Sequence, residues 1–223
     1  MEILKKNSIK KPKIIQTSFN KELALKAIST LGGESFVIDK YNEQVIMLLL
    51  AYFHGLPIFE TAFPERNYSL HKGIMLVGKI GTGKSTLMDV FARYCKLFLP
   101  HHKYIFIDVR RVANHFMTEG NLDKYTYNLI KPRLSYERKP TTNYCFDDLG
   151  TEAENVKFYG TEIDPIRELL MDRYNLFKSH GIITHATTNL DFAHLKERYG
   201  ERLASRMREM FNFIILEGFD RRH

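Results

Sequence analysis

The fold is decided by the stretch Gly73-Ile74-Met75-Leu76-Val77-Gly78-Lys79-Ile80-Gly81-Thr82-Gly83-Lys84-Ser85-Thr86. The apolar run before Gly78 predicts a strand, and the segment from Leu87 to Tyr94 predicts a helix. The residues between them fit the pattern G-x-x-x-x-G-K-[ST], which is typical of a phosphate-binding loop when a strand precedes it and a helix follows it. A chance glycine-rich turn, which is the alternative, would not need both neighbours.

Each part of this loop has a physical role in holding phosphate. The glycines let the backbone curl so that its N–H groups point at phosphate oxygens, and the positive end of the following helix adds to the attraction. Lys84 can reach the β- and γ-phosphates, and the Ser85 hydroxyl can take a place on Mg²⁺. We therefore expect the chain to bind a nucleoside triphosphate, ATP, through Gly78, Lys79, Ile80, Gly81, Thr82, Gly83, Lys84, Ser85 and Thr86.

Composition adds broad constraints. A length of 223 residues fits one domain with an appended arm, and the formal charge of +7 favours an acidic partner such as nucleic acid. Many soluble proteins are mildly basic, so the charge is a weak indication. Two cysteines and the absence of a secretory pattern favour a reduced, cytoplasmic protein. The longest apolar run, Val45 to Phe53, is too short to span a bilayer, and we expect no membrane partner.

The first part of the chain predicts a basic arm followed by two helices. The arm carries Lys5, Lys6, Lys10, Lys11 and Lys13, which could contact nucleic acid or a partner or simply be solvated. A helix is expected over 20–31, with Asn20 as its N-cap and Leu23, Ala27 and Ile28 on one face. A second helix is expected over 41–54, and residues 60–72 are expected to form a loop.

From residue 74 onward, apolar runs alternate with helical segments. The predicted strands are Ile74–Val77, Lys103–Val109, Tyr144–Phe146, Ile182–Ala186 and Phe213–Leu216. Asp164-Pro165 predicts a helix start, Gly181 predicts its stop, and the buried stripe between them comprises Ile166, Leu169, Leu170, Tyr174 and Phe177. This alternation predicts an α/β fold with a five-stranded parallel sheet and helices on both faces.

An acidic pair follows the third predicted strand. Asp147 ends an apolar run and is the natural residue to hold Mg²⁺ through its water shell. Asp148 lies one step on, where a general base could polarise the attacking water. An Asp-Asp turn at a strand end is also common by itself; its occurrence together with the phosphate loop favours the catalytic interpretation.

Two further features bear on catalysis. Asn189 follows the strand over 182–186, where it could hold the lytic water or touch the γ-phosphate, and it could equally cap a helix. Arg202 and Arg206 are four residues apart and share a helix face. That basic face could be solvated surface, or it could donate an arginine to the γ-phosphate bound by a neighbouring subunit.

These motifs, in this order, resemble the AAA+ family, and within it the DnaC-like helicase loaders and the IstB-like transposition ATPases. The resemblance is carried by GKIGTGKST, YCFDDLG, ATTNL and RYGERLASRMREMFNFI. It implies an ATPase domain over 36–223, preceded by a basic arm and short helix over 1–35. It also implies that Asn189 is sensor 1 and that Arg206 is the arginine finger, with Arg202 as second choice.

The sequence departs from the family pattern in two places. Most AAA+ proteins have Glu where Asp148 stands, although the IstB-like branch is similar in using Asp-Asp. Few residues follow Arg208, so we expect no C-terminal helical lid and no sensor 2 arginine. Together with an arginine that acts on a neighbour, this predicts weak ATPase activity in the isolated monomer and a need for an oligomer, a ring or a spiral.

A basic segment after the second predicted strand is a candidate contact for single-stranded DNA. It begins with Arg110 and Arg111 and continues with Lys124, Tyr125, Tyr127, Lys131, Arg133, Arg138 and Lys139. Basic and aromatic side chains together can pair phosphates and stack on bases. In the resembled family this region faces single-stranded DNA. A solvated amphipathic helix with Phe116 and Tyr127 packed inward explains the pattern equally well.

Four functions are compatible with the sequence. The leading one is a helicase loader that oligomerises with ATP, binds single-stranded DNA and assembles on a replicative helicase. The second is a transposition helper whose partner is a transposase. A P-loop small-molecule kinase is the third, and it is disfavoured because about seventy residues precede the loop, whereas in kinases the loop lies near the start of the chain. The fourth is a nucleotide-gated adaptor without useful hydrolysis.

Overall fold

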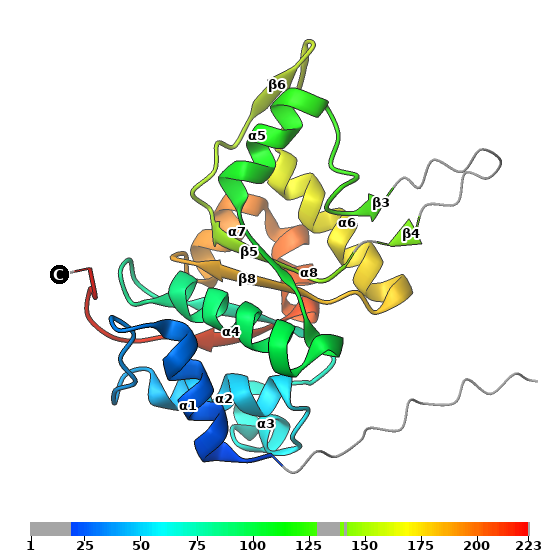
Figure 1. Cartoon of the computed structure of the whole chain (residues 1–223). Coiled ribbons are helices and arrows are strands. Elements are labelled where there is room, and N and C mark those ends of the chain that lie inside the picture. The colour runs from blue at the N-terminus through cyan, green and yellow to red at the C-terminus, as the bar shows by residue number, and fades with distance from the viewer. Residues whose placement is uncertain (1–18, 129–138, 141, 223) are drawn as a thin grey trace, which may run out of the picture.

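The protein is built on a five-stranded parallel sheet, seen in a computed structural model that describes residues 19–128, 139–140 and 142–222 (Figure 1). The strand order is β2-β5-β8-β1-β9. The strands are β1 (Gly73–Val77), β2 (Ile105–Asp108), β5 (Tyr144–Leu149), β8 (Thr184–Thr188) and β9 (Phe211–Ile215). The predicted fold class is confirmed, and the five predicted strands are all present with shifted ends.

Helices cover both faces of this sheet. On one face lie α1 (Lys21–Gly32), α2 (Glu43–Phe53) and α4 (Lys84–Phe98); on the other lie α5 (Val109–Glu119), α6 (Pro165–His180), α7 (Phe192–Tyr199) and α8 (Glu201–Met210). Strand alternation divides the side chains between the two cores: Ile74 and Leu76 pack with α2 and α4, and Met75 packs with α6 and α8. Buried on both faces, β1 therefore reads as a continuous apolar run.

Short elements occupy the connections. The prediction of a loop over 60–72 is wrong in part, because α3 (Ile58–Thr61) and the 3₁₀ turn η1 (Pro64–Arg66) lie there, and η2 (Pro100–His102) follows α4. Two antiparallel ribbons were not predicted. One pairs β3 (Tyr127–Asn128) with β4 (Lys139–Pro140), and the other pairs β6 (Val156–Phe158) with β7 (Thr161–Ile163). Both are too short to give a clear period-two pattern.

Two predicted helix ends are confirmed, whereas the predicted face of α1 is wrong. The Asn20 side chain accepts from the Leu23 N–H at 3.0 Å, and Gly181 ends α6 with φ 65°, as predicted. The prediction that Leu23 lies on the buried face of α1 is wrong: Leu23 is 65% exposed, and Ala24 and Ile28 are buried against α4 instead. Thus α1 packs into the same core as α4; the boundary between 35 and 36 remains a prediction.

Other expectations concern parts of the chain at its two ends. The lysines of the predicted basic arm lie outside the described residues. After β9, the described residues 216–222 contain no helix. Within the described part of the chain, no helix has the length and apolarity that a bilayer span requires.

Cys95 and Cys145 are both free and buried, and burial raises the pKa of both thiols, which keeps them unreactive.

His185 is a buried polar group at the centre of the sheet. It lies on β8, where its Nδ1 accepts a hydrogen bond from the Ile74 N–H of β1 at 3.1 Å and its ring packs on Phe53 and Tyr104. Burial lowers the pKa of His185 from 6.5 to about 3. The neutral ring is therefore the form that the folded state accepts.

This burial predicts a pH-dependent stability. Because the folded pKa lies below the unfolded value, the stabilising contribution of His185 is complete above pH 6.5 and is lost as the pH falls towards 3, by up to about 1.4 kcal/mol per pH unit. In His185→Asn an amide oxygen can replace the ring acceptor without titrating. Urea unfolding between pH 5 and 8 should show a shallower loss of stability in the variant than in the wild type. Equal slopes would contradict this account.

Candidate nucleotide-binding site

The carboxyl ends of β1, β5 and β8 meet around a cavity of about 390 Å³. Parallel pairing places these ends at one edge of the sheet, because Val77 is in register with Thr188 and Leu149 also faces Thr188. The cavity is lined by the phosphate loop together with Ser35, Phe36, Val37, Asn42, Leu87, Asp148, Asn189, Leu216, Arg221 and Arg222. The structure thus gathers residues from distant parts of the sequence around the predicted loop.

The loop backbone has the conformation that its glycines allow. Gly81 and Gly83 have φ values of 80° and 94°, in the left-handed region that disfavours other residues. Gly78 is held for a different reason: a Cβ there would lie 2.3 Å from the Leu216 carbonyl oxygen, which follows β9. The N-terminus of α4 begins directly after Gly83, so its first N–H groups point into the cavity region where phosphate would lie.

Lys84 is the charged centre of the loop. Only 4% of it is exposed, and its Nζ donates to the carbonyls of Gly78 and Lys79 at 2.8 Å and to Asn189 Oδ1 at 2.7 Å. Burial lowers the pKa of Lys84, while Asp148 and Asp147 oppose that shift. The loop and the end of β8 therefore hold an ammonium group in place beside the cavity.

Asp147 and Asp148 lie on a bulge in β5. Between the pairs Phe146–Ala186 and Leu149–Thr188, these two residues face the single residue Thr187 of β8. The buried Thr187 hydroxyl donates to Asp147 Oδ1 at 2.6 Å and accepts from the Asp148 N–H at 2.9 Å. Asp148 has a φ of 58°, which turns it out of the strand, and it lines the cavity.

The donor set fits a hydrated Mg²⁺ beside phosphate. Burial raises the pKa of Asp147, and hydrogen bonds from Thr187 and Ser85 oppose that rise. A buried carboxylate next to a hydroxyl is the pair that Mg²⁺ needs in such loops, since waters and phosphates complete its octahedron. The described residues contain no group of three or more His, Cys, Asp or Glu side chains able to hold a metal without such help.

Asn189 and the C-terminal arginines differ in where they lie. Asn189 lies at the cavity in contact with Lys84. Arg206 does not line the cavity; it is half-buried on α8, with its guanidinium 4.8 Å from the Tyr174 ring and its Nη1 2.8 Å from Met171 Sδ, both of α6. Arg202 is exposed on the same helix. The structure therefore brings Asn189 to the loop of its own chain and leaves both arginines away from the cavity.

Sequence patterns missed the segment after β9, which closes one side of the cavity. The Arg221 N–H donates to the Gly81 carbonyl at 2.9 Å, and its guanidinium pairs with Asp39 at 2.9 Å. This pair holds the pKa of Asp39 below its usual range. Arg221 and Arg222 both line the cavity. Two adjacent arginines were a visible signal, but only the fold shows that they face the phosphate loop.

One aromatic side chain of the predicted DNA contact, Tyr125, is not available, whereas Tyr127 is half-buried. Phe116 and Tyr125 are buried, 6% and 2% exposed, so the prediction that Tyr125 could stack on bases is wrong. Arg110 is exposed and forms a two-pronged pair with Asp108, and Arg111 and Lys124 are exposed. Tyr159, at the tip of the β6–β7 ribbon, is 93% exposed. Lys131, Arg133 and Arg138 lie outside the described residues.

Comparisons with known proteins agree on the fold. No protein-family model and no curated protein matches the sequence. Among solved structures, the DnaC helicase loader matches with a TM-score of 0.54 at 22% identity, over 86% of this chain and 99% of that chain. DnaI matches with a TM-score of 0.52 at 18% identity, over 88% of this chain and 93% of that chain.

A replication initiator also matches. AMPPCP-bound DnaA from Aquifex aeolicus gives a TM-score of 0.51 at 15% identity, over 82% of this chain and 48% of that chain. Identities this low show a common fold. The chain therefore has the AAA+ P-loop fold, in the form seen in the DnaC helicase loader, DnaI and DnaA.

Proposed function

We propose that this chain is an AAA+ ATPase of DNA replication that acts as a DnaC-like helicase loader, oligomerising with ATP and binding single-stranded DNA. The observation that carries the proposal is that Lys84, Asp148 and Asn189 line one cavity at the carboxyl edge of the sheet, with Asp147 hydrogen-bonded to Ser85 of the loop. The match over nearly the whole length of the DnaC helicase loader supports the choice of a loader.

The cavity offers each part of Mg–ATP a complementary surface. Phosphates would lie against the loop N–H groups and the Lys84 ammonium, with Ser85 and Asp147 on the metal. Phe36, Val37 and Leu216 also line the cavity and would give the base an apolar surface. Arg221 and Arg222 add positive charge from the same chain, which would partly replace the contact that a helical lid makes in other AAA+ proteins.

The remaining polar groups of the site would have different roles in ATP hydrolysis. Asp148 would accept a proton from water as that water attacks the γ-phosphorus, the bond to the β–γ bridging oxygen breaks and ADP leaves with the electrons of that bond. Asn189 would orient the water or touch the γ-phosphate. Arg206 would supply positive charge to the nucleotide of a neighbouring subunit, because it does not line the cavity of its own chain. On this account the isolated chain binds ATP and hydrolyses it slowly.

A shared site predicts complementation between two inactive variants. Lys84→Ala removes the phosphate contact, and Arg206→Ala removes the charge given to a neighbour; each should lower ATP turnover in the assembled state at least about a hundredfold. When equal amounts of the two variants assemble at random, about one interface in four joins an intact Lys84 in one subunit to an intact Arg206 in its neighbour. Turnover should therefore return in part when the variants are mixed, as measured by phosphate release with single-stranded DNA present.

Arg208→Ala is the matched control for this experiment. Arg208 lies on the same helix with its guanidinium over the Phe192 ring, away from the cavity, so its loss should leave turnover unchanged. Mixtures that stay inactive would contradict an arginine acting between subunits. Transfer of phosphate to a metabolite, with no effect of DNA, would favour the kinase alternative. Pull-downs against a replicative helicase and a transposase would distinguish the helicase loader from the transposition helper.

DNA binding through the basic segment predicts a salt-dependent loss. In Arg111→Ala/Lys124→Ala, which leaves the Arg110–Asp108 pair intact, the slope of log affinity against log salt should fall by about 1.4. The control Lys21→Ala/Lys26→Ala removes the same charge from exposed positions on α1. Fluorescence anisotropy with labelled single-stranded DNA measures both slopes. Equal slopes in the two double variants would place the DNA elsewhere.

A further inference from the structure

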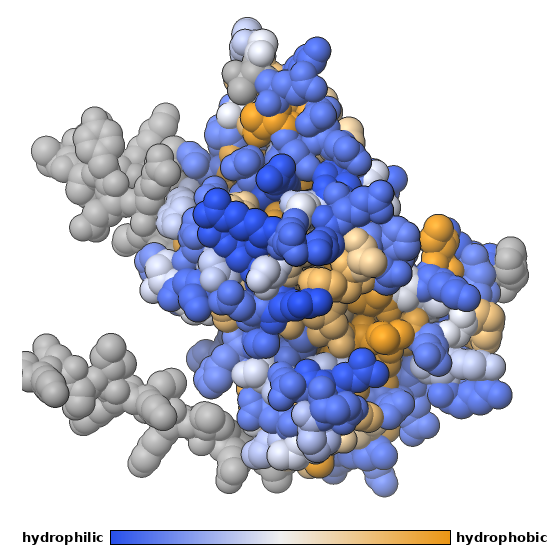
Figure 2. All heavy atoms as spheres, turned by 180° about the vertical axis from the view of Figure 1, so that it is seen from behind, coloured by the Kyte–Doolittle hydropathy of each residue, from blue (hydrophilic) through white to orange (hydrophobic). Residues whose placement is uncertain are grey.

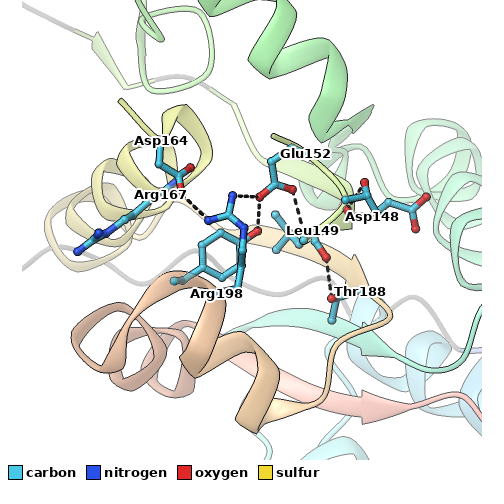
Figure 3. Close-up of polar contacts among 10 residues, drawn as sticks. Asp148, Leu149, Glu152, Asp164, Arg167, Thr188 and Arg198 are labelled. Atoms are coloured by element: carbon cyan, nitrogen blue, oxygen red, sulfur yellow. Dashed lines mark hydrogen bonds and ion pairs between the residues drawn. The ribbon is translucent and has the colours of Figure 1, made fainter. Parts of the chain in front are cut away.

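A buried carboxylate outside the cavity, Glu152, joins the loop after Asp148 to the helix after Asn189 (Figure 3). Its side chain has no exposed surface. Glu152 accepts three hydrogen bonds: from the Gly150 N–H at 2.8 Å, from Arg198 Nη2 at 2.8 Å and from the Tyr199 hydroxyl at 2.7 Å. Charged groups are seldom buried so fully unless they are paired, and this one is paired on both sides.

The first side of this cluster fixes the backbone that carries Asp148. Asp148 and Gly150 have φ values of 58° and 93°, and the Thr151 N–H and hydroxyl both donate to the Asp148 carbonyl, at 3.1 and 2.8 Å. A non-glycine residue with positive φ persists only where its surroundings hold it there. The bond from Gly150 to Glu152 closes this turn just beyond the strained residue.

The second side fixes the segment that carries Asn189. Arg198 and Tyr199 form the last turn of α7, and Arg198 also pairs with Asp164, the N-cap of α6 (Figure 3). The strand end before α7 is tied to the same loop, since the Thr188 hydroxyl donates to the Leu149 carbonyl at 2.8 Å. Both catalytic candidates therefore lie on segments that meet at Glu152.

We propose that Glu152 is a positioning residue for hydrolysis, which sets Asp148 and Asn189 relative to each other through Gly150, Arg198 and Tyr199. The inference rests on the proposed ATPase function and goes beyond it, because Glu152 does not line the cavity and would touch no nucleotide. Loss of this clamp, the hydrogen bonds of Glu152 with Gly150, Arg198 and Tyr199, would leave the phosphate loop intact. It should therefore change the rate of the chemical step more than the affinity for ATP.

The test is a kcat-against-affinity split in the assembled full chain. In Glu152→Gln one acceptor oxygen becomes a donor and faces another donor, so the clamp loosens without a change in size. We expect kcat for ATP to fall on the order of tenfold to a hundredfold. The affinity for Mg–ATP, measured by calorimetry, should stay within about threefold, since the loop contacts are untouched.

Tyr199→Phe is a second, milder variant, in case Glu152→Gln folds poorly. It removes one hydrogen bond to Glu152 and keeps the ring in the core, and we expect a smaller fall in kcat with the affinity unchanged. The matched control is Asn212→Ala. Asn212 is 2% exposed and bonds to the Ser69 and Gly73 carbonyls at the opposite end of β1, so its loss should lower the melting temperature but leave kcat unchanged.

The outcomes separate this inference from the function on which it rests. A wild type that hydrolyses ATP and a Glu152→Gln variant with the same kcat would overturn the positioning role alone. The positioning role would also be overturned if kcat and affinity fell together in proportion to the melting temperature, as in a merely structural loss. A wild type that binds no ATP, or never hydrolyses it, would overturn the proposed function and the inference with it.

Discussion

The parallel pairing of β8 with both β1 and β5 is the constraint on which the whole site depends. It brings the ends of three strands to one edge, so that the phosphate loop, Asp148 and Asn189 line one cavity, with Asp147 bonded to Ser85 of the loop. The bulge in β5 completes the arrangement, because it sets two acidic residues against Thr187 and directs Asp148 towards the cavity. Helices on both faces bury this sheet, which explains the continuous apolar run of β1.

Burial gives the charged groups of the site their electrostatic character. The pKa of Lys84 is lowered and that of Asp147 is raised, so each would gain from an opposite charge placed beside it. A triphosphate with Mg²⁺ supplies both charges at once. The face seen in Figure 2 is mostly hydrophilic, with apolar side chains gathered mainly to the right of its centre and in a smaller group near the top.

Sequence patterns predicted correctly those features that depend on residues close together in the sequence. The loop over 78–86, the cap at Asp164 and the stop at Gly181 each depend on neighbours in sequence, and all were recognised. Contacts between residues far apart in the sequence were not recognised. Nothing near Glu152 in sequence shows that Arg198 will reach it, and nothing near Arg221 shows that Asp39 will. The exposed Leu23 and the buried Tyr125 are failures of the same kind, since the packing of distant elements decided which face was covered.

A crystal structure of the full chain with Mg²⁺ and a non-hydrolysable ATP analogue would show where the nucleotide and the metal lie. Residues at the ends of three strands should form one Mg–nucleotide site. The predicted result places the phosphates in the loop over 78–86, with Lys84 bonded to phosphate in place of Asn189 and the metal beside Ser85 and Asp147. A loop that stays empty at saturating analogue, with Lys84 still bonded to Asn189, would contradict the account.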